Sequence, residues 1–247
     1  MLVREGESVA VPTLIDAAKL QESVQSQIRH RCGYGCVRCG VTIYSFYQFP
    51  VEDEAGWSAP AVVLLCQPCF KTIAAHPLER SQYTALLKRP IARDTQFLRH
   101  QLPYNPSMPR LRVGGAALIR NTSIPVMVAG YAPIGFAPPI NNNGATLITL
   151  TLMTSMGIPE SVIHANIWSP PDDSWQFSYR SGRYIIESSN IESYADIEIS
   201  APDCITINHL VSQVADRKVE LTADWIEIDG KRMTNLIASG HLVGLIA

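Results

Sequence analysis

The chain has 247 residues, of which 47% are hydrophobic and 17% are charged. This balance excludes a disordered chain, and the length allows one large or two modest domains with hydrophobic cores. No run approaches the eighteen apolar residues of a membrane span, and "MLVREGESVA" lacks the features of a secretory signal, so we expect a cytoplasmic protein without membrane contact.

Charge is distributed unevenly along the chain. Residues 1–120 carry fourteen Lys and Arg against nine Asp and Glu, whereas residues 121–247 carry six against thirteen. The net charge of -2 therefore combines a basic first half with an acidic second half. This asymmetry favours two domains with different partners.

The first half is predicted to hold three helices around a cysteine-rich centre. Thr13 can cap a helix through "LIDAAKLQESVQSQIRH", residues 14–30, whose apolar side chains form a stripe. A second helix is expected over about 68–73, and a third over "ERSQYTALLKR", residues 79–89, which Pro90 would end.

A segment rich in proline separates the two halves. "QLPYNPSMPR", residues 101–110, contains three prolines, which disfavour helix and predict an extended linker. We therefore expect a first domain over residues 1–102, a linker over residues 103–109 and a second domain over residues 110–247.

The second domain is predicted to be built from β-strands. Short β-rich runs alternate with turn signals, and three of these are two-residue hairpin turns: Asn143-Gly144, Ser181-Gly182 and Asp229-Gly230. The apolar run "LIASGHLVGLIA", residues 236–247, is either a final strand in the β core, which we favour, or part of a subunit interface. The sequence therefore predicts an α+β protein in which a small metal-stabilised module precedes an antiparallel β sandwich or barrel.

Five of the six cysteines lie within residues 32–69. Cys36 and Cys39 form one Cys-x2-Cys pair, and Cys66 and Cys69 form a second pair 26 residues further on. Four thiolates with this spacing complete a tetrahedral shell around zinc, and a closed shell is typical of structural and not catalytic zinc. Cys32 and Cys204 are more simply explained as buried thiols.

These motifs resemble the zinc-stabilised HNH endonucleases, which have a ββα-metal fold of the treble-clef type. The resemblance covers residues 29–73, about a fifth of the chain, and depends on "CGYGCVRCG", "IYSFYQF" and "PAVVLLCQPCF". It implies a compact zinc module with flanking helices.

The resemblance also implies where catalytic residues would lie, and this chain lacks them. Tyr47 and Gln48 stand where the family has an acidic residue and its general-base histidine. Ala61 replaces the asparagine that orients that histidine, and Phe70 and Ala74 replace two metal ligands. Trp57 stands where related sequences often have a further histidine. Glutamine cannot accept a proton and phenylalanine cannot bind a metal, so we expect no HNH catalysis.

Two further groups of residues are open to more than one interpretation. Glu52, Asp53 and Glu54 could bind a hard cation as a second metal site, but a solvated acidic loop is the simpler interpretation. His76 could touch the zinc shell, contribute to a second metal site or act as a base, but an ordinary surface or packing histidine is simpler. A basic group could contact phosphates of a nucleic acid or could simply be solvated, and its members are Arg29, Arg31, Arg38 and Lys71.

The sequence therefore favours a non-catalytic zinc-binding protein. Its module would bind or assemble with nucleic acid, a protein partner or further copies of the chain, in a bacterial or phage defence setting that the resemblance implies. No cofactor other than structural zinc is expected. Two alternatives stay open: an active HNH-type endonuclease with a relocated metal site, and a purely structural assembly protein.

Overall fold

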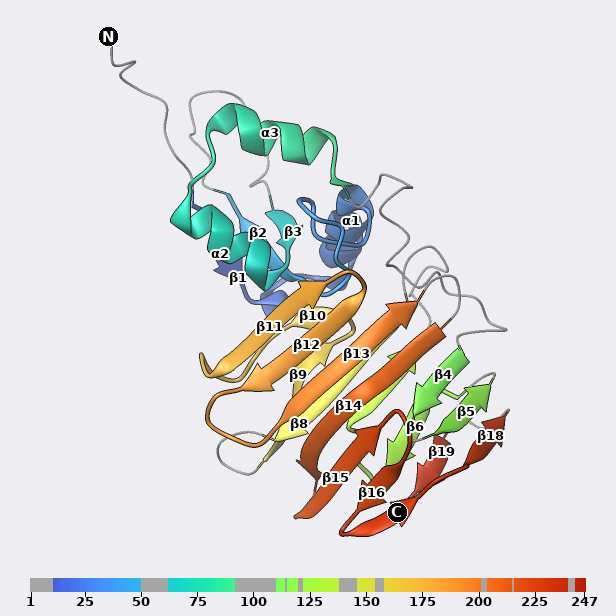
Figure 1. The fold of residues 1–247 in the computed structure, drawn as a ribbon. Coiled ribbons are helices and arrows are strands. Elements are labelled where there is room, and N and C mark those ends of the chain that lie inside the picture. The colour runs from blue at the N-terminus through green and yellow to red at the C-terminus, as the bar shows by residue number, and fades with distance from the viewer. Residues whose placement is uncertain are drawn as a thin grey trace, which may run out of the picture. The chain divides into compact units, whose positions relative to one another are not determined.

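The computed structural model describes residues 11–49, 62–91, 110–113, 115–119, 122–137, 146–153, 158–200, 204–214, 216–239 and 243–247. The chain folds as two compact units, residues 1–98 and 99–247 (Figure 1). The predicted linker and the Asn143-Gly144 turn lie outside the described residues. Within the described ranges, no helix combines the length and apolar character that crossing a membrane requires.

The first unit combines a small sheet with helices. Its elements are β1 (Thr13–Ile15), the 3-10 helix η1 (Ala17–Lys19), α1 (Glu22–Cys32), β2 (Ser45–Gln48), β3 (Val62–Leu65), α2 (Gln67–Ala75) and α3 (Arg80–Lys88). The three strands form an antiparallel sheet in the order β1-β2-β3. The prediction of the second and third helices is confirmed.

The predicted start of the first helix is wrong. Residues 13–15 form strand β1, in which Leu14 lies opposite Tyr47 of β2, and the α-helix begins only at Glu22. Pairing with a neighbouring strand gives these residues backbone partners that local helix propensity does not anticipate. The helix ends at Gly33, whose φ of 73° is left-handed and suits glycine.

The second unit is built from strands. They are β4 (Arg110–Val113), β5 (Ala116–Ile119), β6 (Ile124–Met127), β7 (Ile134–Ala137), β8 (Leu147–Met153), β9 (Pro159–His164), β10 (Ile167–Trp168), β11 (Trp175–Arg180), β12 (Arg183–Ser188), β13 (Tyr194–Ser200), β14 (Cys204–Val214), β15 (Arg217–Thr222), β16 (Ile226–Ile228), β17 (Lys231–Met233), β18 (Ile237–Ser239) and β19 (Val243–Ile246). The prediction of a β-rich second domain is confirmed.

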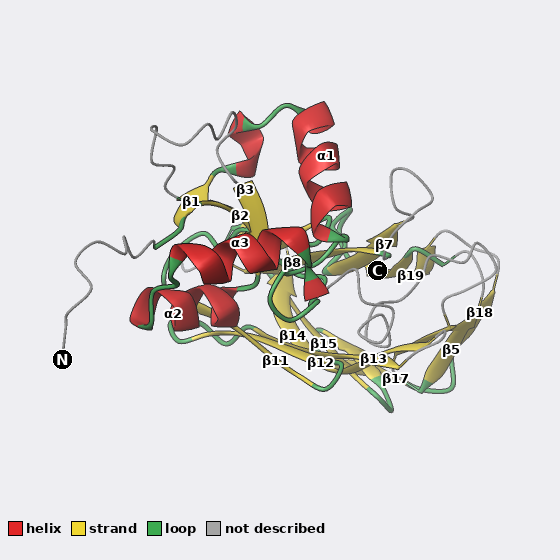
Figure 2. Cartoon of the chain, turned by 90° about the horizontal axis from the view of Figure 1, so that it is seen from above, coloured by secondary structure: helices red, strands yellow, loops and turns green. Residues whose placement is uncertain are grey.

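The strands of the second unit form two layers (Figure 2). One layer is a ten-stranded sheet with the path β11-β12-β13-β14-β15-β16-β17, to which β4, β5 and β18 are added beside β14. The other layer holds the four-stranded sheet β10-β9-β8-β7 and the pair β19-β6. β8 packs against β14 between the layers, and alternate residues of the long strands fill the core, as Ile197 and Ile199 of β13 do.

The sequence predicts an antiparallel β domain, but three strand pairs of the second unit are parallel. β4 pairs with β14, β18 with β5 and β19 with β6 in parallel orientation. Residues 236–247 therefore supply two separate edge strands, and Ile237 is 84% exposed instead of buried in the core. Parallel partners must come from distant segments, so no local turn signal announces them.

Candidate metal centre

Two turns of the first unit bring four cysteines together. Cys36 and Cys39 lie in the turn after α1, where the amide of Cys36 donates to the carbonyl of Val41 and the amide of Gly40 donates to the carbonyl of Cys36, each over 2.8 Å. Cys66 occupies the N-cap position of α2, and Cys69 lies in its first turn. The amide of Val37 donates to the carbonyl of Leu64 over 2.9 Å, and this bond ties the first turn to β3, which leads into the second.

The spacing of the four sulfurs suits one tetrahedral metal ion. The four Sγ atoms lie within 4.8 Å of one another, and those of Cys39 and Cys66 are 3.6 Å apart. At a Zn–S distance of about 2.3 Å, a tetrahedron places its sulfurs about 3.8 Å apart. The four cysteines could therefore bind a metal ion such as zinc. Cys32 is buried and does not belong to this group.

Hydrogen bonds among these thiols shift the pKa values of Cys36, Cys66 and Cys69. Burial raises the pKa of Cys36, but hydrogen bonds from Cys39, Cys66 and Cys69 outweigh it and lower that pKa well below its ordinary value. Hydrogen bonding with Cys36, more than any other cause, raises the pKa of Cys66 and of Cys69. Cys36 is thus favoured as a thiolate, whereas a metal ion bound by all four sulfurs would have to displace the protons of Cys66 and Cys69.

The N-terminus of α2 contributes to the same charge balance. The helix dipole gives this end a partial positive charge, which favours thiolates at Cys66 and Cys69. Four thiolates would fill the coordination shell and leave no position for water or substrate, so this arrangement is suited to holding the fold together.

Two of the positions that the HNH resemblance associates with catalysis, Tyr47 and Phe70, hold stacked aromatic rings. Tyr47 of β2 is 4% exposed, and its ring stacks on that of Phe70 of α2 with centroids 4.5 Å apart and planes 20° apart. Burial raises the pKa of Tyr47, so its phenol stays protonated. Gln48 ends β2 and is half-buried, whereas Ala74 is exposed on α2. The sequence indicated that these residues replace catalytic ones, but not that two of them stack.

The basic residues of the first unit are not equally available to a ligand. Arg29 is 9% exposed, donating from Nε to the Tyr44 hydroxyl over 3.1 Å and from Nη2 to the Gln25 side-chain oxygen over 2.9 Å. Its guanidinium also lies over the ring of Phe46, 5.5 Å from the centroid. The phosphate contact suggested for Arg29 therefore does not agree with its buried position.

The other three basic residues keep some exposure. Arg31 is exposed, but its Nη2 donates to the carbonyl of Val62 and so helps to hold α1 against β3. Lys71 is exposed on α2, and Arg38 is half-buried in the first cysteine turn. His76 follows α2 as its C-cap residue and is exposed.

Several candidate residues cannot be placed. Glu52, Asp53, Glu54, Trp57 and Ala61 lie outside the described residues. Among the residues that the structure does describe, only the four cysteines form a group of metal-ligating side chains.

Comparisons with known proteins give no family for this chain: no protein-family model, no curated protein and no solved structure matches it.

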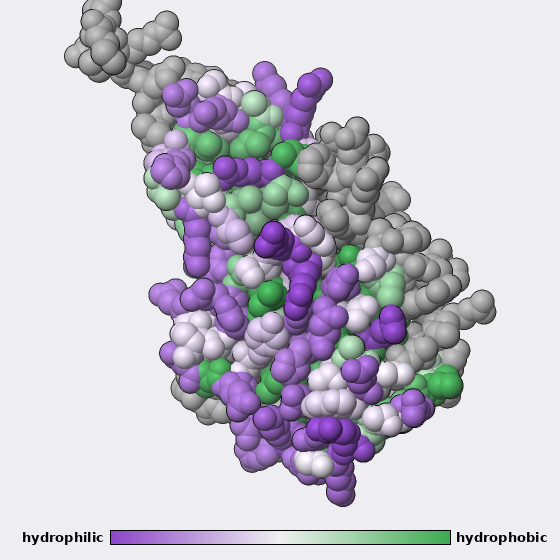
Figure 3. Space-filling model, in the orientation of Figure 1, coloured by the Kyte–Doolittle hydropathy of each residue, from purple (hydrophilic) through white to green (hydrophobic). Residues whose placement is uncertain are grey.

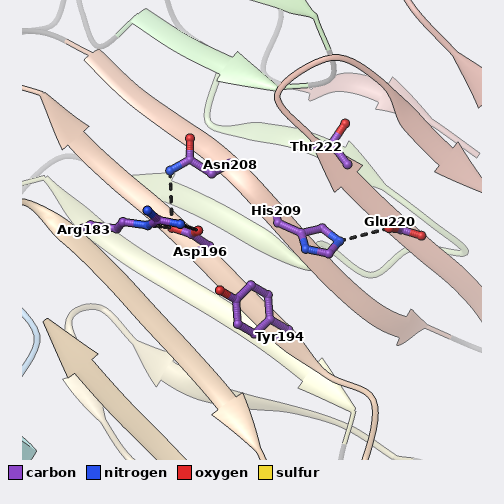
Figure 4. Close-up of a pocket in the computed structure, with 7 residues that line it drawn as sticks. All are labelled: Arg183, Tyr194, Asp196, Asn208, His209, Glu220 and Thr222. Atoms are coloured by element: carbon purple, nitrogen blue, oxygen red, sulfur yellow. Dashed lines mark hydrogen bonds and ion pairs between the residues drawn. The ribbon is translucent and has the colours of Figure 1, made fainter. Parts of the chain in front are cut away.

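Sequence reasoning missed a polar cluster that lies on the ten-stranded sheet of the second unit, around Asp196 and His209 (Figure 4). Its one local signal is the alternation in "YADIEIS", which places Tyr194, Asp196 and Glu198 on the face opposite to Ile197 and Ile199. The partners of these residues lie on other strands, and sequence spacing does not reveal them.

Proposed function

We propose that the first unit is an HNH-like module of the treble-clef type that holds one structural zinc ion and works by binding or assembly without nuclease activity. The stacked pair of Tyr47 and Phe70 is the observation that carries this proposal. The resemblance assigns an acidic residue and a metal-binding histidine to these two positions. In this chain, aromatic rings occupy both and pack against each other.

The chemistry of the replacement residues supports the loss of activity. A nuclease of this type needs a base that accepts a proton near neutral pH and a divalent ion that stabilises charge on the phosphate. The phenol of Tyr47 stays protonated, the amide of Gln48 has no basic nitrogen, and Phe70 offers no ligand atom. Zinc on four thiolates has no open position with which to replace the missing ion.

The contacts of the basic residues favour a protein partner, or a second copy of the chain, over nucleic acid. Nucleic-acid affinity grows with the number of phosphates that Lys and Arg neutralise. Arg29 is buried, and Arg31 already donates a hydrogen bond to the backbone carbonyl of Val62. Of the four basic residues considered, Arg38 and Lys71 thus keep side chains without a described hydrogen bond to the protein, which is a small basis for phosphate binding.

A cleavage assay with two cysteine variants tests this proposal. The full chain is incubated with plasmid, linear duplex, single-stranded DNA and RNA in magnesium, manganese or nickel, beside Cys66→Ser, which removes a zinc ligand. Cys204→Ser, a cysteine outside the cluster, is the matched control. We expect no cleavage by any of the three proteins. Cleavage that survives repurification, persists in Cys204→Ser and disappears in Cys66→Ser would falsify the proposal.

Binding is measured on the same preparations. Gel-shift titration reports nucleic-acid affinity, and light scattering after size-exclusion chromatography reports mass. We expect no gel shift of nucleic acid at physiological salt. If the partner is a second copy of the chain, the mass from light scattering should exceed that of one chain. A strong, salt-dependent shift would transfer the binding role to nucleic acid while leaving the loss of catalysis intact.

A further inference from the structure

The outer face of the ten-stranded sheet carries an open polar hollow of about 530 Å³. It extends across β12, β13, β14 and β15, and its lining includes Arg183, Tyr194, Asp196, Asn208, His209 and Glu220 (Figure 4). Hydrophilic residues dominate this face in the space-filling view (Figure 3). The hollow belongs to the second unit and is independent of the metal centre.

A β-bulge creates the centre of the hollow. The pairing of β13 with β14 shifts between Asp196 and Ile197, because Asp196 lies opposite His209 whereas Ile197 lies opposite Ile207. The extra residue in β14 is Asn208. A bulge bends its strand and redirects side chains, and here the polar side chains of Asn208 and His209 both line the same hollow.

Asp196 is a buried carboxylate on the outward side of the sheet. It is 3% exposed, and it accepts hydrogen bonds from Arg183 Nε at 2.8 Å, from Arg183 Nη2, and from Asn208 Nδ2 at 3.3 Å. The side chain of Arg183 is 53% exposed, and an ion pair with one partner in solvent contributes little to stability. The network instead fixes the direction of polar groups that a ligand can contact: Asn208 keeps its side-chain oxygen turned away from Asp196 (Figure 4).

A second polar pair lies beside the first. His209 and Glu220 are joined by a hydrogen bond of 3.0 Å between Nε2 and Oε1, and the ring of Tyr194 lies 5.5 Å from that of His209. The side chain of His209 is 40% exposed and that of Glu220 is 22% exposed, so both are accessible to a ligand. Tyr194 adds a hydroxyl and an apolar ring face at the same place.

The charged side chains of the hollow are already paired with one another, which disfavours a charged ligand. The guanidinium of Arg183 is matched by Asp196, and Glu220 is already bonded to His209. A phosphate or carboxylate ligand would therefore have to compete with Asp196 for Arg183 and with Glu220 for His209. Donors and acceptors nevertheless lie side by side on planar side chains, next to an aromatic ring.

We propose that this hollow binds a neutral carbohydrate of one or two rings. Adjacent sugar hydroxyls each donate and accept, which suits the mixed set of Arg183, Asn208 and Glu220, and the C–H face of a sugar can pack on Tyr194. The volume agrees with a small-molecule site. An open hollow and a small ligand limit the affinity, so we expect a dissociation constant of the order of 1 mM.

Nuclear magnetic resonance on the full chain tests the proposal. Saturation-transfer difference spectra are recorded with glucose, galactose, mannose, N-acetylglucosamine, cellobiose and diacetylchitobiose. Titration of the ¹⁵N-labelled chain then maps shifted amides. We expect transfer to at least one of these sugars and shifts confined to β12–β15. Asn208→Ala and Tyr194→Leu should each weaken binding roughly tenfold, because each removes a polar or packing contact.

The controls distinguish variants that lose a ligand contact from variants that lose the native fold. Gln213→Ala alters an exposed residue of β14 outside the hollow and should leave affinity within about twofold. Thermal melts show which variants keep the native fold, and only those are compared. The proposal is overturned by absence of transfer from all six sugars, by equal binding in folded Asn208→Ala and Tyr194→Leu, or by tighter binding of inorganic phosphate than of any sugar.

Discussion

Tyr47 carries much of the packing between sheet and helix in the first unit. It is 4% exposed and stacks on Phe70, while Phe49 and Tyr83 form a second stacked pair with centroids 5.1 Å apart. Together these pairs fix α2 and α3 against the β2 segment. A unit of this size has only a small hydrophobic core, so stacked aromatic pairs contribute much of the packing of these helices on the sheet.

Truncation of Tyr47 should be costly. We expect Tyr47→Ala to lower the free energy of unfolding of the first unit by about 3–5 kcal/mol, because it removes a buried ring and leaves a cavity. Tyr47→Phe retains the ring and serves as the matched control, with an expected loss near 1 kcal/mol. Urea denaturation with zinc present gives both values. Equal losses in the two variants would show that the hydroxyl and not the stack matters.

Two glycines of the second unit have the same backbone conformation but different surroundings. Gly115 has a φ of +68° and Gly230 a φ of +76°. A Cβ atom at Gly115 would lie 2.6 Å from the carbonyl oxygen of Asp224, whereas a Cβ at Gly230 would meet nothing within 4 Å.

Alanine substitution at these two positions should separate the cost of a left-handed backbone from the cost of a steric contact with Asp224. Gly230→Ala should cost about 1–2 kcal/mol, the cost of a left-handed backbone alone. Gly115→Ala should cost about 1–3 kcal/mol more, because the backbone must move to relieve the contact. Thermal unfolding of the second unit measures both. A Gly115→Ala variant as stable as Gly230→Ala would contradict the close approach.

Among the elements, those with local signals could be predicted from the sequence. The Ser181-Gly182 and Asp229-Gly230 hairpins are confirmed: both residues of each dipeptide have positive φ, as a type I′ turn requires. Thr13–Ile15 was misassigned because only its distant partner β2 makes it a strand. The four cysteines could be picked out by spacing, whereas the Tyr47–Phe70 stack and the bulge beside Asp196 depend on contacts between elements.

The cysteine turns should depend on metal and on pH. Zinc binding would require the loss of protons from Cys66 and Cys69, whose pKa values are raised chiefly by hydrogen bonding with Cys36. Protons therefore compete better as the pH falls, so zinc affinity should drop with acidification, by up to tenfold per pH unit for each proton displaced. Elemental analysis at neutral pH should find one zinc per chain, and a chromogenic chelator should follow its release during acid titration.

Loss of the ion should unfold the first unit without unfolding the second. Circular dichroism after chelation should show reduced helix content and a retained β signal, since the described helices lie in the first unit and the described elements of the second are strands. Cys32→Ser, which changes a cysteine outside the cluster, should keep its zinc. A zinc content well below half an equivalent, with no other metal bound, would contradict the four-thiolate site.

Two strands near the C-terminus, β18 and β19, add one strand to each layer of the second unit. β18 pairs with β5 in the ten-stranded sheet, and β19 pairs with β6 as a separate two-stranded sheet in the other layer. Val243, Gly244 and Leu245 are half-buried, while Ile237 and Ile246 are 84% and 72% exposed. This segment therefore contributes backbone pairing at the sheet edges more than side chains to the core.

Deletion of residues 236–247 should produce aggregated protein. The edges of β5 and β6 would lose their partners, and unpaired edges readily pair with other chains. Sedimentation of the lysate and light scattering of any soluble fraction measure the outcome. The double substitution Ile237→Thr and Ile246→Thr is the control, since it keeps the backbone pairing and should stay soluble. A soluble truncated chain with a native melting transition would contradict this role.

The parallel edge pairs also constrain how the chain can fold during its synthesis. Ile237 pairs with Ala117, and Val243 with Ile124, so about 120 residues separate the partners in each pair. At a translation rate of about 5–20 residues per second, β5 and β6 leave the ribosome on the order of ten seconds before β18 and β19. Throughout that interval the nascent second unit presents two open strand edges, one in each layer. Chaperone binding should therefore be strongest on ribosome-bound chains that extend past β6 but stop short of β18.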